Sequence, residues 1–173
     1  MKDRAAQIKL IFLDVDGVLT DGRITLNEKG EETKSFDVKD GLGLKLLMRD
    51  GIEIVIVTGR RSPVVAHRAK ELGIREVFQG ISDKRSVCRE LIERRGLSKS
   101  QVGSVGDDLP DLAMFRECGL CMTVADAAEE VQEQADYIAT RSGGRGAVRE
   151  ISEWILKCRG CWPRIAFTEQ STD

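Results

Sequence analysis

The sequence predicts an α/β fold, a Rossmann-like three-layer α/β/α sandwich with a mainly parallel sheet and a β-hairpin flap. Two observations predict it. Short apolar runs of strand length alternate with helical segments along most of the chain. Three of these runs end directly in polar side chains, and the carboxyl ends of parallel strands are where open α/β sheets place their ligands.

The expected elements follow in order along the chain. The first strand begins at Leu10 and leads into Asp14 and Asp16. Further strands are expected within residues 52–60 and 102–111 and near residues 76–78, 120–124 and 137–138. Helices are expected over residues 41–50, 62–72, 83–95, 109–117, 127–134 and 146–157. Pro63 at the first helical position and Asp83 as an N-cap mark two of the helix starts.

Composition indicates one globular domain. The chain has 173 residues, of which 41% are hydrophobic and 32% charged. We expect a single domain over residues 1–159, with the hairpin flap at about 21–37 and a loose tail over 160–173. The net charge of −2, with cations interspersed, argues against nucleic-acid binding. No apolar run is long enough for a membrane span and no signal-peptide core is visible, so we expect no membrane association and a cytoplasmic location.

Two acidic clusters are the main chemical signal. Asp14 and Asp16 follow the first strand, and the run V-G-S-V-G-D-D-L-P-D supplies Asp107, Asp108 and Asp111. Acidic turns after strands are common, so either cluster alone has an ordinary explanation. Two carboxylate clusters at one edge of a parallel sheet would repel each other unless a hard divalent cation lay between them. Oxygen ligands of this kind favour Mg²⁺.

Phosphate-binding groups lie between the two clusters. The strand within residues 52–60 ends in Thr58, Gly59 and Arg60, which offer a hydroxyl, a close backbone approach and a guanidinium fork. Lys84 opens the helix over residues 83–95, where a cation opposes the helix dipole unless it serves an anion. A strand-to-helix turn and a surface lysine are the ordinary alternatives for these two segments.

Together these motifs resemble the haloacid dehalogenase-like phosphatases. The four motifs D-V-D-G-V-L-T, T-G, a lone lysine and G-D-D-L-P-D occur in order. The resemblance implies that Asp14 is the nucleophile and Asp16 the general acid and base, while Thr58 and Lys84 hold the phosphoryl group. It implies that Mg²⁺ is held by Asp14, the main-chain carbonyl of Asp16, and Asp107. Asp108, also assigned to the metal site, and Asp111 would act through water or by orienting neighbours.

The chemistry agrees with these roles. A phosphomonoester is dianionic, so a carboxylate can attack phosphorus only when a metal and a lysine offset that charge. Asp14 would form an aspartyl-phosphate. Asp16 would protonate the leaving oxygen and then activate water, which requires a raised pKa.

A hairpin takes the place of the cap domain that many members of this family carry. Only 43 residues separate Asp14 from Thr58, and 22 separate Lys84 from Asp107, so neither gap holds a cap. Residues 23–36 alternate around an N-E-K-G turn, which predicts a β-hairpin. An isolated two-stranded ribbon is marginally stable, so we expect it to pack on another subunit of an obligate homo-oligomer.

A narrower resemblance concerns the substrate. The runs F-D-V-K-D-G at 36–41, T-G-R, L-G-I and G-G-R-G-A-V-R-E at 143–150 resemble the branch of the family that converts 3-deoxy-D-manno-octulosonate (KDO) 8-phosphate to KDO and phosphate in lipopolysaccharide precursor synthesis. The resemblance implies a homotetramer in which some substrate contacts cross a subunit boundary. The expected substrate contacts are Asp16, Asp37, Val38, Lys39, Asp40, Gly41, Lys45, Gly59, Arg60, Arg68 and Lys84. Lys45 stands where an arginine is expected, and the two cations are not equivalent.

Three alternatives remain open at this point. The nearest is a phosphatase for nine-carbon 2-keto sugar acid 9-phosphates, a group that tends to carry an acidic residue in place of Arg60. The second is a noncatalytic assembly module, against which the intact acidic clusters argue. The third is a phospho-acceptor receiver domain, which gives no reason for Asp16 two residues after Asp14.

The cysteines and the single histidine carry weaker signals. Cys118 and Cys121 form one C-x-x-C pair, and Cys158 and Cys161 form another. The 36 residues between the pairs exceed the usual zinc spacing, so buried or inert thiols are the favoured interpretation. His67 is expected at a surface or interface rather than in catalysis.

Overall fold

The computed structural model describes residues 1–162 and residue 164. Its centre is a six-stranded sheet in the order β5-β4-β1-β6-β7-β8, in which every neighbouring pair is parallel. The predicted α/β fold with a mainly parallel sheet is therefore confirmed. The strands are β1 (Leu10–Leu13), β4 (Glu53–Thr58), β5 (Glu76–Gln79), β6 (Val102–Val105), β7 (Leu120–Thr123) and β8 (Tyr137–Ile138).

Strand β1 lies between β4 and β6 and is buried along its whole length. Helices cover both faces of the sheet, so the central strands β1 and β4 are buried at consecutive positions rather than at alternate ones. Because the strands are parallel, the residues that follow β1, β4 and β6 emerge side by side at one edge. This arrangement places Asp14, Thr58 and Asp107 at the same edge.

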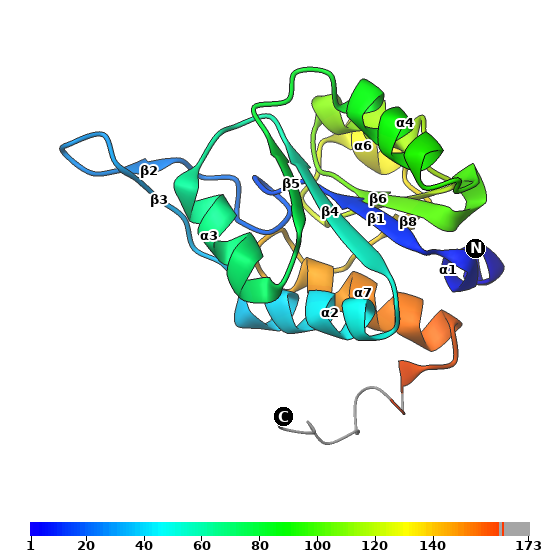
Figure 1. Ribbon diagram of the computed structural model, residues 1–173. Helices are drawn as coiled ribbons and strands as arrows, with labels where there is room; N and C mark the ends of the chain where they lie inside the picture. Colours follow the sequence, from blue (N-terminus) through cyan, green and yellow to red (C-terminus); the bar gives the residue numbers. More distant parts are fainter. Residues whose placement is uncertain (163, 165–173) are drawn as a thin grey trace.

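The helices form the two outer layers (Figure 1). On one side lie α1 (Lys2–Gln7), α2 (Val38–Arg49) and α7 (Ala147–Cys158), with α3 (Pro63–Leu72) next to α2. On the other side lie α4 (Lys84–Arg94), α5 (Leu112–Phe115) and α6 (Glu129–Gln134). The described residues also include two short 3₁₀ helices, η1 (Lys99–Gln101) and η2 (Leu109–Asp111).

Helix α1 was not predicted, and two expected helices differ clearly from the sequence prediction. Helix α2 begins at Val38 rather than near residue 41, because the side chain of Asp37 accepts a hydrogen bond from the Lys39 amide at 2.7 Å and caps the helix earlier. The segment expected as one helix over 109–117 is divided into η2 and α5. Asp108 and Asp111 form a capping box around Pro110 that holds the first turn in the 3₁₀ form.

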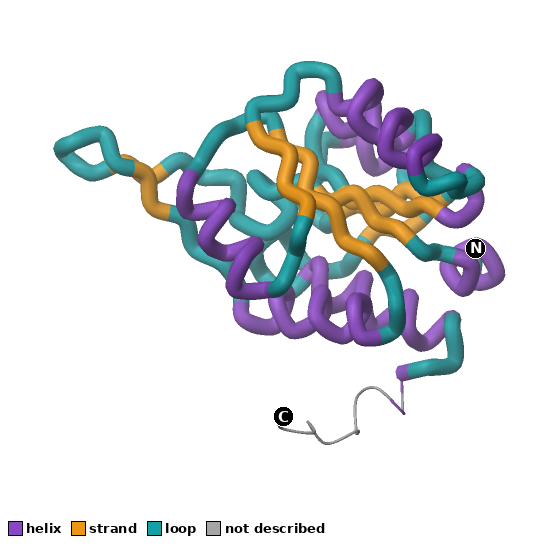
Figure 2. Tube along the Cα trace, viewed as in Figure 1, coloured by secondary structure: helices purple, strands orange, loops and turns teal. Residues whose placement is uncertain are grey.

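The predicted hairpin is confirmed and projects away from the sandwich (Figure 2). It consists of β2 (Thr25–Leu26) and β3 (Glu32–Thr33), which pair antiparallel across a turn closed by the Asn27 amide and the Glu31 carbonyl at 3.0 Å. Ile24 and Leu26 on this hairpin are each 57% exposed. The predicted domain boundary at residue 159 stays a prediction, and most of the expected tail over 160–173 lies outside the described residues.

The remaining sequence signals behave as packing residues. All five cysteines are free thiols, and Cys88, Cys118 and Cys121 are buried. Burial raises the pKa of Cys88 to about 12 and that of Cys121 to about 11, so neither is a thiolate at neutral pH. Among the described helices, none combines the length and apolar character that crossing a membrane requires.

Candidate active site

The strand ends open onto a cavity of about 550 Å³. Thr58 closes β4 there and is buried, and Gly59 and Arg60 follow it at the rim. The cavity therefore holds each of the predicted catalytic residues. Its lining consists of Asp14, Asp16, Gly22, Thr58, Gly59, Arg60, Ile81, Ser82, Lys84, Asp107, Asp108, Pro110 and Asp111.

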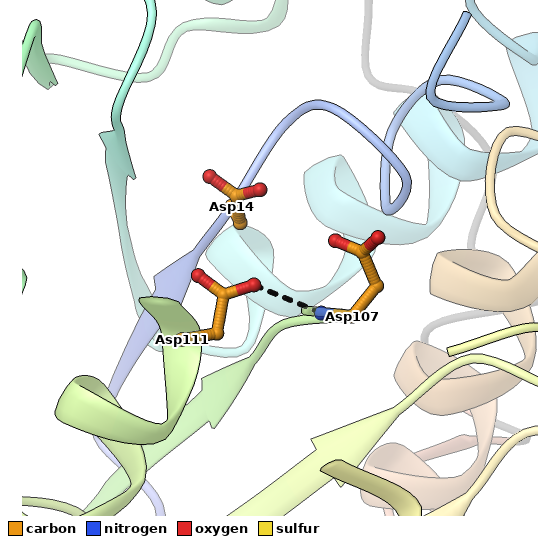
Figure 3. A group of neighbouring side chains, drawn as sticks. All are labelled: Asp14, Asp107 and Asp111. Carbon is orange, nitrogen blue, oxygen red and sulfur yellow. Dashed lines mark hydrogen bonds between the residues drawn. The ribbon is translucent and has the colours of Figure 1, made fainter. Parts of the chain in front are cut away.

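Three carboxylates converge in this cavity (Figure 3). Asp14 follows β1, Asp107 follows β6 after Gly106, and Asp111 comes from η2. One oxygen from each of the three lies within 4.8 Å of the other two. Such a set of hard oxygen donors is the kind of site that Mg²⁺ prefers.

Asp111 is fixed by its neighbours on both oxygens. Its Oδ2 accepts hydrogen bonds from the amides of Asp107 at 2.9 Å and Asp108 at 3.3 Å, and its Oδ1 accepts one from Lys84 Nζ at 2.6 Å. A side chain at Gly106 would lie 2.3 Å from Asp111 Cβ, so only glycine fits there. Asp111 therefore orients the loop that carries Asp107.

Lys84 provides the positive charge at the base of the site. Its side chain is 5% exposed, and its Nζ lies 2.7 Å from Asp14 Oδ1 and 2.6 Å from Asp111 Oδ1. Burial by itself would lower the pKa of Lys84, but the two carboxylates outweigh burial and raise it. Lys84 is therefore a permanent ammonium, although it stands in the first turn of α4 where the helix dipole opposes a cation.

The geometry fits a divalent cation between Asp14 and Asp107. Asp107 Oδ1 is buried and has no hydrogen-bond partner among the described residues. Burial, followed by the charge of Asp111, raises the pKa of Asp107 to about 8 and that of Asp14 to about 6. A bound cation would offset both the burial of these carboxylates and their mutual repulsion.

The other two predicted metal residues, Asp16 and Asp108, lie outside the group of three converging carboxylates. Asp108 lines the cavity, but it is exposed and its carboxylate caps η2 by accepting from the Leu109 amide at 2.8 Å. It is not among the three carboxylates that converge. The contact expected from the main-chain carbonyl of Asp16 stays a prediction.

Glycines hold the loop after β1 against Asp107. Gly17 has a φ of +93°, and a Cβ there would lie 1.9 Å from Asp107 Oδ2. A Cβ at Gly143 would lie 1.7 Å from the Gly17 carbonyl oxygen, and the Gly144 amide donates to the Val18 carbonyl at 2.9 Å. The segment G-G-R-G thus supports the loop that carries Asp14 and Asp16, a role that its sequence did not reveal.

We expect the metal-free protein to lose stability as pH rises. A carboxyl whose pKa is raised on folding stabilises the folded state fully below its unfolded pKa near 4 and loses that effect as pH rises through the folded pKa. For Asp107 this window ends at about pH 8. In EDTA, urea denaturation should give an unfolding free energy that falls by up to about 1.4 kcal/mol per pH unit per carboxyl within this window.

Asp107→Asn is the matched comparison for that titration, because it keeps the shape but carries no ionisable group. Its unfolding free energy should fall less steeply with pH than that of the wild type. Mg²⁺ should restore wild-type stability most at about pH 8, where the ionised carboxylates need it. If the unfolding free energy fell equally steeply with pH in the two proteins, the raised pKa of Asp107 would be contradicted.

Asp16 lies in the cavity beside the predicted Arg60 and close to two residues of the hairpin that we did not predict. Its carboxylate is paired with Lys34 Nζ, and its Oδ2 lies 3.8 Å from Arg60 Nε. Arg60 Nη2 in turn contacts Glu32 Oε1 at 2.7 Å. Lys34 and Glu32 come from the hairpin, where their spacing of two places them on the same face. The spacing of Glu32 and Lys34, next to a predicted acidic site, was the sequence feature that could have identified these two residues as part of the site.

Several expected substrate contacts lie outside this cavity. Val38 and Arg68 line a second groove of about 230 Å³ with Lys34, Phe36, Val64, His67 and Glu71. The Arg68 guanidinium lies 5.8 Å from the Phe36 ring centroid and packs against Gly41. Asp37 and Lys39 lie at the start of α2, and Lys45 is exposed farther along it. Within one chain the structure does not bring these residues to Asp14.

Asp40 makes contacts that the sequence did not suggest, while its expected contact with substrate stays a prediction. Its side chain is buried, and its two oxygens accept hydrogen bonds from the amides of Gly146 at 3.2 Å and Arg149 at 2.8 Å. It therefore caps the start of α7 from the neighbouring helix. The sequence could not show this, because more than 100 residues separate the partners.

We expect Asp40→Ala to destabilise the protein by about 2–3 kcal/mol without changing KM, because two amides at the start of α7 lose their acceptor. Urea denaturation and steady-state kinetics measure the two quantities. Asp37→Ala, which removes a more exposed cap, should cost about 1 kcal/mol. Unchanged stability together with a raised KM would instead favour a substrate contact for Asp40.

Known proteins resemble this chain over most of its length. A model of the haloacid dehalogenase-like hydrolase family matches residues 70–151. The 3-deoxy-D-manno-octulosonate 8-phosphate phosphatase of Haemophilus influenzae is 41% identical over 160 residues, which cover 92% of this chain and 89% of that enzyme. The chain belongs to the KDO 8-phosphate phosphatase family of haloacid dehalogenase-like hydrolases. The resemblance predicted from the motifs is confirmed.

Two further members of the KDO 8-phosphate phosphatase family are also similar to this chain. The enzyme of Escherichia coli K12 is 41% identical over 157 residues, covering 91% of this chain and 84% of its own. The crystal structure of the Moraxella catarrhalis enzyme, in complex with magnesium ion, phosphate ion and KDO, matches with a TM-score of 0.92 and 45% identity over 95% of each chain. Membership in this family sets aside the receiver-domain alternative.

Proposed function

We propose that this chain hydrolyses KDO 8-phosphate to KDO and inorganic phosphate, with Mg²⁺ as cofactor, in lipopolysaccharide precursor synthesis. The observation that carries the proposal is the Asp14 carboxylate, held at 2.7 Å by the Lys84 ammonium and facing Asp107 inside the cavity. This pairing of nucleophile and counter-charge suits attack on a dianionic phosphomonoester. Two relatives that are each 41% identical to this chain, over 160 and 157 residues, carry the name of that activity.

In the first step, Asp14 attacks phosphorus and the bond from phosphorus to the sugar oxygen breaks. Asp16 donates its proton to the departing oxygen, which leaves as the KDO hydroxyl. In the second step, Asp16 takes a proton from water, and the resulting nucleophile attacks the aspartyl-phosphate. Inorganic phosphate leaves and the Asp14 carboxylate is regenerated, so the cycle is closed.

The remaining residues bind and orient the phosphoryl group. Lys84 remains charged throughout, since the carboxylates around it raise its pKa. Thr58 and the Gly59 amide offer donors to the phosphoryl oxygens from the end of β4. Asp14, Asp107 and the main-chain carbonyl of Asp16 would hold Mg²⁺, which would supply further positive charge to the phosphoryl group.

Arg60 supports the eight-carbon substrate over the nine-carbon alternative. It lines the cavity, and its side chain is 45% exposed, so it can meet an anionic group of the substrate. Phosphatases for the nine-carbon acids tend to have an acidic residue at this position. KDO 8-phosphate carries a carboxylate in addition to its phosphate, which gives Arg60 a second anion to bind.

Phosphate release from a substrate panel tests the proposal. The panel holds KDO 8-phosphate, a nine-carbon 2-keto sugar acid 9-phosphate, a hexose phosphate and p-nitrophenyl phosphate, each with Mg²⁺ or EDTA. We expect magnesium-dependent release with a strong preference for KDO 8-phosphate. Preference for the nine-carbon ester would support the sister activity, and no release from any ester would support a noncatalytic assembly module.

The proposal includes a homotetramer with cytoplasmic location. The exposed apolar side chains of Ile24 and Leu26 on the projecting hairpin support the oligomer, as do the substrate contacts expected along α2 and α3 that lie outside the cavity of their own chain. Light scattering should give about four times the 19.2 kDa of one chain. Leu26→Asp should lower that mass and reduce activity, whereas a wild-type monomer at micromolar concentration would contradict the tetramer.

The cytoplasmic location is tested separately by cell fractionation, in which the protein should be found in the cytoplasmic fraction.

A further inference from the structure

A closed ring of alternating charges joins the hairpin to the active-site cavity. Lys34 Nζ pairs with Asp16 and lies 3.3 Å from Glu32 Oε1. Arg60 Nη2 lies 2.7 Å from the same Glu32 oxygen, and Arg60 Nε lies 3.8 Å from Asp16 Oδ2. Two cations thus alternate with two carboxylates, and one of each comes from the hairpin.

The ring is largely withdrawn from solvent on its hairpin side. The Lys34 side chain is 1% exposed and that of Glu32 is 13% exposed, although both belong to a ribbon that projects from the sandwich. Ion pairs that are shielded in this way are stronger than pairs on an open surface. The cations at this end of the cavity are therefore already neutralised in the protein without substrate.

We propose that Glu32 occupies, in the free enzyme, the position at Arg60 and Lys34 that the substrate carboxylate takes on binding. This inference rests on the proposed function, because it assumes a substrate with a carboxylate beside its phosphate. Glu32 is then a specificity-determining residue that acts as an internal substitute for that carboxylate. Substrates without a carboxylate leave the ring closed.

Charge balance supports the exchange. Lys84 is shared by Asp14 and Asp111, so it has no spare charge for a second anion of the substrate. An incoming carboxylate competes with Glu32 for Arg60 and Lys34, because one Glu32 oxygen lies within 3.3 Å of both cations and like charges in contact repel.

Of the two ring carboxylates, Glu32 is the one that can withdraw. Asp16 lies in the loop after β1, which is packed against Gly143 and Gly144. Glu32 lies on a ribbon whose two strands have only two residues each. Within the described residues these strands pair only with each other, so the Glu32 side chain can rotate away from Arg60 without disturbing the six-stranded sheet.

Binding of KDO tests the exchange without depending on hydrolysis. Calorimetry would compare KDO with its methyl ester, which lacks the charge, in the presence of Mg²⁺ and inorganic phosphate. Glu32→Gln keeps the size of the side chain and removes its charge. We expect it to bind KDO about threefold to tenfold more tightly than the wild type, because an exposed or partly shielded ion pair is worth about 1 kcal/mol. Binding of the methyl ester should not change.

Glu28→Gln is the matched control, since it removes the same charge from the exposed turn of the same hairpin. It should bind both compounds as the wild type does. A second variant, Glu32→Ala, should also favour KDO over the ester. The exchange would be overturned if Glu32→Gln bound KDO no more tightly than the wild type does, or if it changed the binding of KDO and of the methyl ester equally. It would also be overturned if neither the wild type nor any variant bound KDO.

The two proposals fail in different experiments. Absence of phosphate release from KDO 8-phosphate counts against the proposed function, whatever the binding results. Selective tightening of KDO binding in Glu32→Gln supports the exchange even then, since the measurement involves no bond cleavage.

Discussion

Asp14→Asn should lower phosphate release by at least about 10⁴-fold, because an amide cannot form the phosphoryl-enzyme and the neighbouring carboxylates have other roles. Asp111 is held by Lys84 and two amides, and Asp108 caps η2. The amide of the variant keeps the shape of the side chain and can still accept from Lys84. Steady-state release of phosphate from KDO 8-phosphate measures the effect.

The fold should survive this substitution. Asp14, Asp107 and Asp111 repel one another when no cation is bound, so removing one charge relieves that repulsion. The melting temperature in EDTA should therefore not fall, while the rise in melting temperature on adding Mg²⁺ should shrink. Asp21→Asn, an exposed position on the following loop, serves as the control with near wild-type turnover. Turnover within tenfold of wild type in Asp14→Asn would exclude Asp14 as the nucleophile.

Lys84→Met should lower kcat/KM by about 10³-fold and destabilise the metal-free protein by about 3 kcal/mol. Without the ammonium, Asp14 and Asp111 are two buried carboxylates with no counter-charge, and breaking a buried pair from one side typically costs 3–5 kcal/mol. We expect the lower end of this range, because Asp14 and Asp111 can take up protons and so lose the unpaired charge. Urea denaturation in EDTA and kinetics with KDO 8-phosphate measure the two effects.

The pH dependence distinguishes this electrostatic role from simple packing. Lys84 lowers the pKa of Asp14, so its removal should raise that pKa further above the present value of about 6. A raised folded-state pKa means that stability is lost as pH rises, so the deficit of Lys84→Met should be larger at about pH 8 than at about pH 5. Mg²⁺ should offset part of it.

Arg85→Met is the matched control for Lys84→Met. Arg85 is the next residue, and its exposed side chain pairs with Glu117 at the surface. Its loss should change the unfolding free energy by no more than about 0.5 kcal/mol at either pH. A deficit of Lys84→Met that is equal at both pH values would show that Lys84 acts by packing alone.

Much of the site could be predicted because it depends on local features. A strand that ends in a polar residue must present it at the sheet edge, and parallel strands share that edge, so Asp14, Thr58 and Asp107 had to meet. Helix starts such as Asp83 before α4 follow from hydrogen bonds within one turn. Both rules concern residues close together in the chain, so the spacing of residues within a motif is enough to predict the result.

Contacts between distant segments could not be predicted in this way. The sequence by itself determined the α/β class, the order of the strand ends and the acidic clusters, because each depends on neighbours a few residues apart. Only the tertiary structure decided that Asp40 caps α7, that Gly143 supports Gly17, and that Glu32 and Lys34 reach Asp16 and Arg60. The physical reason is that side-chain pairing depends on how whole elements pack, and many arrangements of the hairpin and of α7 satisfy the same local pattern.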